Sequence, residues 1–293
     1  MIKPIFVVGN NRSGTKFTSN LILNNQSVSG VQNEYHRGIL ETNVFNNAPK
    51  VFGPLSEREN YIAFVESFAA TDFFKTTNLN KEILYQKRTR NYYDFFRYVM
   101  NSYAKKNNAK FWLQKIHPYV LPRVYLYFTD AKYIFIKREV VDTVRSAVNH
   151  QKKMNTYTKC TLLKETFLYW YGIKIMNSFD NKHKDNILFI DFEELVNYTE
   201  KVVKRICSFI DLHFFPDMLI SKYKRNTSFT NKWERATFLS RIDTILIKLF
   251  SFLFLLMPLF FYTITYQLCI SMHQRKKSFL SDTFYIISRE KNI

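Results

Sequence analysis

The chain has 293 residues, a mass of 35.2 kDa and a formal net charge of +19, and this length is enough to bury one sizeable core. With 6 Gly, 7 Pro, no internal repeat and no Gly/Ser/Pro-rich linker, the composition excludes a flexible array of many domains. Cys160, Cys207 and Cys269 are too few and too far apart for a disulfide framework or a metal site, so we expect a reducing compartment and no metal.

The first informative segment is an apolar run that leads into a polar glycine loop. Residues Ile5 to Val8 predict a buried strand, and the loop from Gly9 to Thr15 is followed by a segment compatible with a helix. Glycine lets the backbone turn its N–H groups inward, and the N–H groups at a helix N-terminus attract anions. Arg12 adds a positive charge from within the loop. This segment therefore predicts a phosphate-binding cradle.

Arg12-Ser13-Gly14-Thr15 resembles the 5′-phosphosulfate loop of sulfotransferases that use 3′-phosphoadenosine 5′-phosphosulfate (PAPS), in which a basic residue precedes Ser-Gly-Thr. A P-loop nucleotide kinase is the alternative, since Gly9 and Gly14 have the Walker A spacing. A Walker A loop needs Lys followed by Ser or Thr, whereas here Thr15 comes first, and this order disfavours the kinase. The resemblance implies that the donor is bound by Arg12, Ser13, Gly14, Thr15 and Lys16.

Between Glu57 and Lys106 the sequence is helical in pattern and rich in aromatic residues. In the sulfotransferase family such an insertion commonly builds the acceptor side of the cleft. Lys115 follows, at the end of an apolar strand that begins at Phe111. Its ammonium group is expected at the carboxyl edge of the sheet, where ligands collect in open α/β folds. The resemblance implies that Lys115 and Arg12 stabilise the charge of the transition state.

Two residues compete for the role of general base. Glu34 follows the loop helix at nearly the distance at which tyrosylprotein and many bacterial sulfotransferases place a catalytic glutamate. His117, two residues after Lys115, matches the lysine-x-histidine pattern of cytosolic sulfotransferases, whose histidine is the base. Both assignments stay open, and Glu34 is preferred because the arginine loop resembles the branch that uses glutamate.

A second motif begins with the apolar strand from Tyr133 to Ile136 and continues into an amphipathic helix. It resembles the 3′-phosphate motif of the same family, with Arg138 at the strand end, Asp142 four positions later and Ser146 eight positions later. The proline that usually follows the arginine is missing. A guanidinium that binds two phosphate oxygens and a hydroxyl that binds a third suit a fixed phosphomonoester. The resemblance therefore implies that Arg138 and Ser146 bind the 3′-phosphate.

The strand-like runs predict an α/β fold with three layers, in which helices flank a central parallel sheet on both faces. The last run, near Ile187 to Ile190, resembles the late strand of sulfotransferases, and we interpret Asp191 as a structural or loop-ordering carboxylate. The segment from Asn226 to Phe229 resembles a nucleotide-side loop, and Lys232 adds charge for the 3′-phosphate in this interpretation. The four expected strands lie at Ile5 to Val8, Phe111 to Leu113, Tyr133 to Ile136 and Ile187 to Ile190.

The stretch from Leu249 to Ile270 has 22 residues without a charge, which reaches the length of a membrane span. Basic residues flank it on both sides, so charge gives no orientation. A spanning helix, a hairpin or helix lying on the membrane, and a buried helix stay open, and we rank membrane association above burial. We accordingly expect a catalytic domain over residues 1–235 and a C-terminal hydrophobic helical segment over residues 236–293.

The resemblance implies a sulfotransferase that moves a sulfuryl group from PAPS to a hydroxyl or amine of a carbohydrate, a glycolipid or a lipid-linked acceptor. The alternatives are the kinase and a non-catalytic basic protein that binds nucleic acid or membranes. We expect no nucleic-acid partner, because no helix-turn-helix, zinc-ligand or RNA-binding aromatic pattern is present. The first strand follows the N-terminus at once and leaves no room for a signal peptide. We therefore expect a cytoplasmic location, with membrane contact on the cytoplasmic face.

Overall fold

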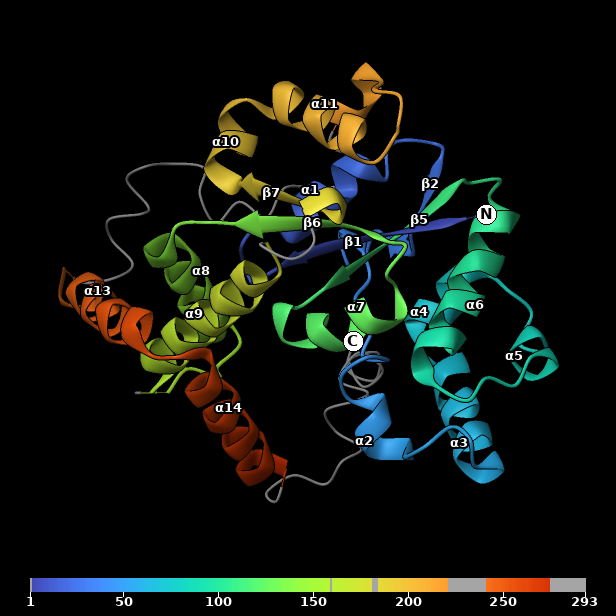
Figure 1. Cartoon of the computed structure of the whole chain (residues 1–293), viewed down its shortest axis with the longest axis horizontal. Coiled ribbons are helices and arrows are strands. Elements are labelled where there is room, and N and C mark those ends of the chain that lie inside the picture. Colours follow the sequence, from blue (N-terminus) through green and yellow to red (C-terminus); the bar gives the residue numbers. More distant parts are fainter. Residues whose placement is uncertain (1, 159, 181–183, 221–240, 275–293) are drawn as a thin grey trace.

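Five parallel strands form the central sheet of the computed structural model, which describes residues 2–158, 160–180, 184–220 and 241–274 (Figure 1). The α/β class and the four strands expected from the apolar runs are confirmed. The additional strand, β2, has two residues and no apolar run that marks it in the sequence. In spatial order the strands are β2 (Val28–Ser29), β5 (Phe111–Ile116), β1 (Lys3–Gly9), β6 (Lys132–Lys137) and β7 (Ile187–Asp191).

The side chains of the sheet enter two separate cores, because successive residues of a strand point to opposite faces. Both faces are covered, which explains why these strands are apolar at almost every position instead of alternating. One core receives Phe6, Val8, Trp112, Tyr133 and Phe135. The other receives Ile5, Val7, Leu113, Ile134 and Ile136.

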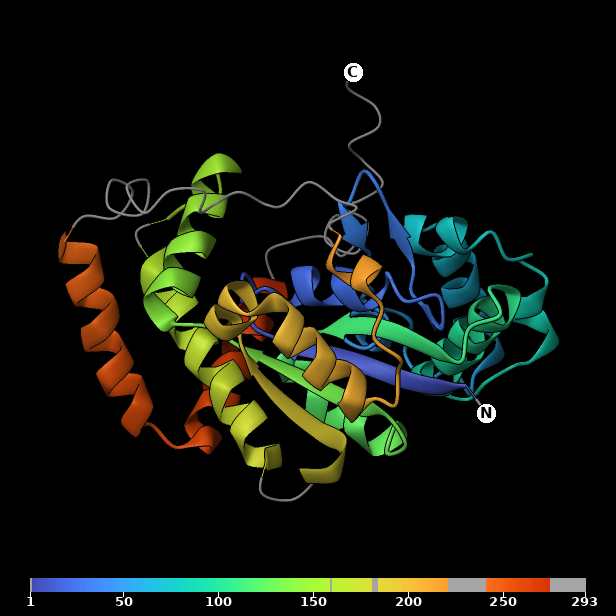
Figure 2. The same ribbon diagram turned by 90° about the horizontal axis from the view of Figure 1, so that it is seen from above.

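Helices cover the two faces, as the sequence predicts for a three-layer fold (Figures 1 and 2). One face carries α1 (Thr15–Ile22), α10 (Phe192–Asn197) and α11 (Thr199–Phe209). The opposite face carries α6 (Tyr92–Lys106), α7 (Leu121–Tyr127), α8 (Val140–Lys153) and α9 (Thr161–Asp180). Short 3-10 turns lie at Pro118–Val120, Lys184–Asn186 and Pro216–Leu219.

The helical region expected between Glu57 and Lys106 consists of α3 (Arg58–Ala69), α4 (Asp72–Thr77), α5 (Ile83–Gln86) and α6. Before it, the chain forms a two-stranded hairpin of β3 (Gln32–Asn33) and β4 (Gly38–Ile39), and then α2 (Ala48–Phe52). Edge-to-face aromatic contacts hold this region together, for example between Phe64 and Phe95, whose ring centroids lie 4.8 Å apart.

The C-terminal apolar stretch forms two helices, α13 (Arg241–Leu256) and α14 (Leu259–Gln274). They are bent by 113° around Pro258, which has no N–H group to continue the first helix. Ile247 and Tyr262 are fully buried in the core beside α9. Among the described residues no single helix is long and apolar enough to cross a membrane, whereas the bent pair meets that test in length and composition. The expected domain boundary at residue 235 lies outside the described residues.

Candidate active site

The loop after β1 has the strained backbone of a phosphate cradle. Arg12 and Gly14 both have positive φ angles, of 68° and 98°. The backbone N–H of Ser13 and its hydroxyl both donate to the carbonyl of Asn10, at 3.2 and 2.7 Å. Gly14 is required here, since a Cβ atom at this position would overlap the ring of Phe192. The loop thus leads directly into the N-terminus of α1, where the first N–H groups of the helix favour an anion.

Arg12, Arg138 and Ser146 meet at the carboxyl end of the sheet, as their spacing predicts. The Nε of Arg12 donates to the Ser146 hydroxyl at 3.0 Å, and the Nη1 of Arg138 donates to the Arg12 carbonyl at 2.8 Å. Arg138 and Ser146 are buried, and burial also lowers the pKa of Arg12. These contacts join the two predicted phosphate motifs into one site.

Glu139 occupies the position at which the family motif usually has a proline, and its side chain caps the N-terminus of α8. Its carboxylate accepts the backbone N–H of Asp142 at 2.8 Å, as an N-cap residue does. Because α8 begins at Val140, Arg138 stays at the end of β6 and Ser146 falls on the buried face of the helix. The departure from the family pattern therefore leaves the position of both residues intact.

Three further residues support Arg138 and were not predicted as parts of the site. The Arg138 guanidinium lies over the ring of Phe192, 4.7 Å from its centroid. The Tyr169 hydroxyl donates to the Arg138 carbonyl at 2.7 Å, and the Asn10 side-chain amide donates to the Tyr169 carbonyl at 2.9 Å. Tyr169 lies in α9 and Phe192 begins α10, so no local motif connects them with Arg138 in the sequence.

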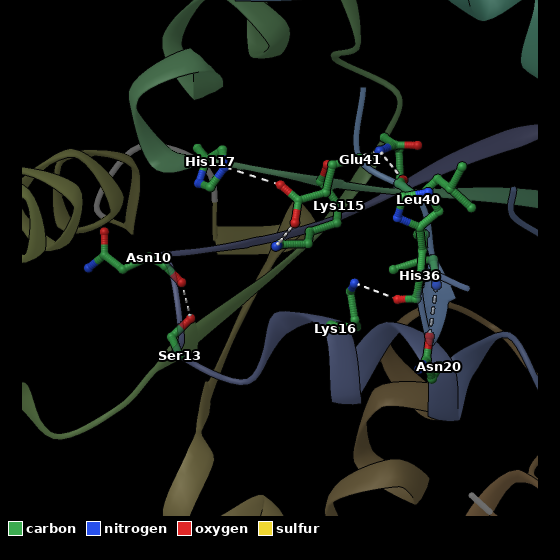
Figure 3. Close-up of polar contacts among 11 residues, drawn as sticks. Asn10, Ser13, Lys16, Asn20, His36, Leu40, Glu41, Lys115 and His117 are labelled. Carbon is green, nitrogen blue, oxygen red and sulfur yellow. Dashed lines mark hydrogen bonds and ion pairs between the residues drawn. The ribbon is translucent and has the colours of Figure 1, made fainter. Parts of the chain in front are cut away.

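Lys16 and Lys115 bring two ammonium groups to the same space. Lys16 donates to the His36 carbonyl at 2.9 Å, and Lys115 donates to the Glu41 carboxylate (Figure 3). Burial lowers the pKa of Lys16, and the neighbouring charges of Lys115 and Arg12 lower it further. Such mutual repulsion indicates a site built to receive negative charge.

Glu41 lies between Lys115 and His117 (Figure 3). One carboxylate oxygen accepts from the Lys115 ammonium at 2.5 Å, and the other lies 3.3 Å from Nε2 of His117. The charge of Lys115, followed by the hydrogen bond from His117, holds the pKa of the Glu41 carboxyl well below its ordinary value of 4.5. The Lys115 side chain is 7% exposed and that of Glu41 is 43% exposed. Glu41 was not predicted from the sequence.

The pairing of Glu41 with Lys115 predicts a pH-dependent contribution to stability. Since the folded-state pKa is lowered, this contribution is fully present above the unfolded value of 4.5 and is lost as the pH falls through the folded-state pKa. We expect the difference in melting temperature between the wild type and Glu41→Gln to be constant near neutrality, to shrink as the pH falls below 4.5 and to vanish below the folded-state pKa. Thermal unfolding over this range measures it, and a difference that persists unchanged at the acid end would contradict the pairing.

The two residues proposed as the base occupy different surroundings. Glu34 lies in the exposed turn between β3 and β4, and within the described residues its carboxylate makes no hydrogen bond or ion pair. His117 stacks on Tyr119 with 5.0 Å between ring centroids, and Tyr119 in turn contacts Tyr266 of α14 at 5.4 Å. The C-terminal helix therefore reaches the surroundings of His117. Asn226 to Phe229 and Lys232 lie outside the described residues.

Two hollows adjoin the pair of Glu41 and His117. Glu41 forms part of the wall of one with a volume of about 730 Å³, and His117 forms part of the wall of another of about 390 Å³, open space at their mouths included. Asn10 and Asn11 of the loop also line the smaller one. The described residues hold no cluster of three or more side chains that suits a metal ion. The site thus combines a cationic loop, a carboxylate and two hollows.

This combination of fold and site defines an α/β protein suited to an anionic ligand. Over residues 4–217 the chain matches the model of the Sulfotransferase family. It is similar in structure to the sulfotransferase domain from the curacin biosynthetic pathway (TM-score 0.52, 16% identity, 80% of this chain and 83% of that chain). It is also similar to that from the olefin synthase of Synechococcus PCC 7002 (TM-score 0.52, 17% identity, 84% and 93%). The search of the curated proteins found no match. The chain belongs to the Sulfotransferase family and is a sulfotransferase.

Proposed function

We propose that this enzyme transfers a sulfuryl group from PAPS to a hydroxyl or amine of its acceptor. The observation that carries the proposal is the contact of Arg12 with Ser146 and Arg138, which joins the two phosphate motifs. PAPS is the donor that the family implies, and the donor groups present fit its phosphates and sulfate. The residues that would hold its 5′-phosphosulfate are Arg12, Ser13, Gly14, Thr15 and Lys16. Those that would hold its 3′-phosphate are Arg138 and Ser146.

We propose Glu41 as the general base, in place of Glu34. Glu41 is the carboxylate that contacts Lys115 and His117, whereas Glu34 has no such contact among the described residues. We infer that Lys115 turns from Glu41 to the sulfuryl oxygens when the donor binds. Without that neighbouring charge the pKa of Glu41 rises toward its ordinary value, which makes the carboxylate a better proton acceptor. Lys115 and Arg12 then stabilise the charge that grows on the leaving phosphate.

Thermal stabilisation by nucleotides tests the proposed donor. A ligand that binds only the folded state raises the melting temperature, by about 2.7 kcal/mol of stability at a hundred times its dissociation constant. We expect 3′-phosphoadenosine 5′-phosphate (PAP) to stabilise the enzyme far more than AMP, which lacks the 3′-phosphate, and more than ATP with Mg²⁺. Stabilisation by Mg²⁺ and ATP but not by PAP would overturn the proposal in favour of the kinase alternative.

We also propose that α13 and α14 hold the enzyme at an anionic membrane surface, which would place it on the cytoplasmic face. Their face away from α9 is apolar and exposed, and Lys248 on α13 is exposed as well. Both views show α13 at the outer edge of the molecule (Figures 1 and 2). Exposed apolar surfaces of this extent mark interaction sites, and the net charge of +19 favours anionic lipids. The exposed apolar residues of these helices are Ile242, Ile245, Leu249, Phe252, Leu253, Leu255, Leu256, Phe260, Phe261, Ile264 and Leu268.

Sedimentation with phospholipid vesicles tests this membrane contact. We expect the wild type to bind vesicles that contain phosphatidylserine, and Leu253→Ser combined with Phe260→Ser to weaken binding by roughly tenfold for each side chain removed. The matched control is Leu126→Ser, which changes a side chain of α7 that is 73% exposed and should leave binding unchanged. Equal binding by the double variant and the control would contradict the proposed surface.

A further inference from the structure

The larger hollow beside Glu41 is a pocket with apolar walls, here called the aromatic pocket. It lies between the segment after β4 and the helices α2, α3 and α4. The space between these elements, with the open space at its mouth included, is about 730 Å³. Glu41 is the carboxylate in its wall that also contacts Lys115. The apolar residues that line the pocket are Leu40, Val44, Ala48, Phe52, Phe64, Phe68 and Phe73. The polar residues His36, Asn43, Ser67 and Asp72 lie at its wall as well.

Two of the hydroxyl groups in this pocket, those of Thr71 and Thr42, already have partners within the protein. The Thr71 hydroxyl donates to the Phe68 carbonyl at 2.6 Å and accepts the N–H of Phe74 at 3.3 Å. The Thr42 hydroxyl accepts the N–H of Val44 at 3.3 Å. A sugar seated here would bury several hydroxyl groups against phenyl rings, and each buried polar group without a partner costs free energy. An apolar chain or ring system carries no such cost.

We propose that the acceptor is a lipid-like alcohol, whose apolar body fills the aromatic pocket and whose hydroxyl lies at Glu41. This inference rests on the proposed transfer from PAPS. The acceptor oxygen forms a bond to sulfur as its proton passes to the Glu41 carboxylate. The bond between sulfur and the bridging oxygen of the 5′-phosphate breaks, and its electron pair stays on PAP. Among the acceptors expected from the sequence, the apolar wall of the aromatic pocket favours the lipid-linked class over free carbohydrates.

A series of primary alcohols of increasing chain length tests the acceptor class. With radiolabelled PAPS as the donor, we expect kcat/KM to rise by roughly three- to fourfold for each added methylene until the pocket is full. Free galactose and lactose should accept no sulfate. Transfer to these sugars, or rates that do not depend on chain length, would overturn the inference. Stabilisation by PAP is measured first on the same protein. If PAP stabilises the enzyme but long-chain alcohols are not preferred, the inference about the acceptor fails while the proposed sulfuryl transfer from PAPS stands.

Ser67 and Ala63, one turn apart on α3, offer a matched pair of substitutions. Ser67 lines the aromatic pocket and is half-buried, whereas Ala63 is exposed and does not line it. We expect Ser67→Trp to lower kcat/KM for a long-chain alcohol by roughly tenfold or more while PAP still stabilises the protein. Ala63→Trp should change neither quantity. If Ser67→Trp does not fold, Ser67→Leu replaces it, because its side chain fills less of the pocket. If the folded Ser67 variant keeps the kcat/KM of the wild type, the acceptor binds outside this pocket.

Discussion

Replacing Glu41 with Gln is expected to lower turnover by ~10²–10⁴-fold, the range for losing a general base, while PAP affinity stays near that of the wild type. Gln keeps the shape of the side chain but cannot take the proton of the acceptor. The expectation rests on the contacts of the Glu41 carboxylate with Lys115 and His117, at 2.5 and 3.3 Å. Initial rates of sulfuryl transfer and calorimetric titration with PAP measure the two quantities separately.

Glu34→Gln and His117→Ala are the controls that separate the three candidates for the base. Glu34→Gln should keep most of the turnover, because Glu34 lies in the exposed turn of the β3–β4 hairpin. His117→Ala should have an intermediate effect, since it removes one of the two groups that orient Glu41. If Glu34→Gln abolishes turnover and Glu41→Gln does not, the general base is Glu34, as preferred from the sequence. Loss confined to His117→Ala would instead assign the base to the histidine.

The sequence predicts that Arg12, Arg138 and Ser146 lie together, because local patterns encode the position of each. An apolar run, a glycine loop and a helix start fix the position of Arg12, and the same succession of strand and helix fixes Arg138 and Ser146. Parallel strands then bring their carboxyl ends to one edge of the sheet. The contacts of Arg138 with Arg12, and of Arg12 with Ser146, join residues more than 120 positions apart that two short motifs had already indicated.

Glu41, the proposed base, and the aromatic pocket are less accessible to sequence reasoning. Glu41 lies outside any helix or strand, and its partner Lys115 is 74 residues away, so no spacing marks the pair. The helical pattern between Glu57 and Lys106 predicts buried aromatic faces but not that they enclose a hollow. Likewise, the charge-free stretch after Lys248 predicts apolar helices. It does not show that Tyr262 packs inward while Phe260 remains exposed, since this depends on the position of α9.

Arg138→Ala is expected to weaken the binding of PAP by ~2–4 kcal/mol, the scale for removing one partner of a buried charged pair. The reason is its buried position beside Arg12 and Ser146, where its guanidinium can bind the two oxygens of a fixed phosphate. Binding of adenosine 5′-phosphosulfate, which lacks the 3′-phosphate, should hardly change. Calorimetric titration with both nucleotides measures the difference.

Lys137→Ala is the matched control for Arg138→Ala, because it removes a neighbouring positive charge that lies over the Phe189 ring, 4.1 Å from its centroid. It should weaken the binding of both nucleotides slightly and to a similar extent, because it lowers the positive electrostatic potential around the site without removing a direct contact to the 3′-phosphate. The Arg138 side chain also donates to the Arg12 carbonyl, so its loss could act by releasing the loop. In that case the two nucleotides would lose equal affinity. Equal losses would therefore assign Arg138 to loop positioning and remove it from the 3′-phosphate site.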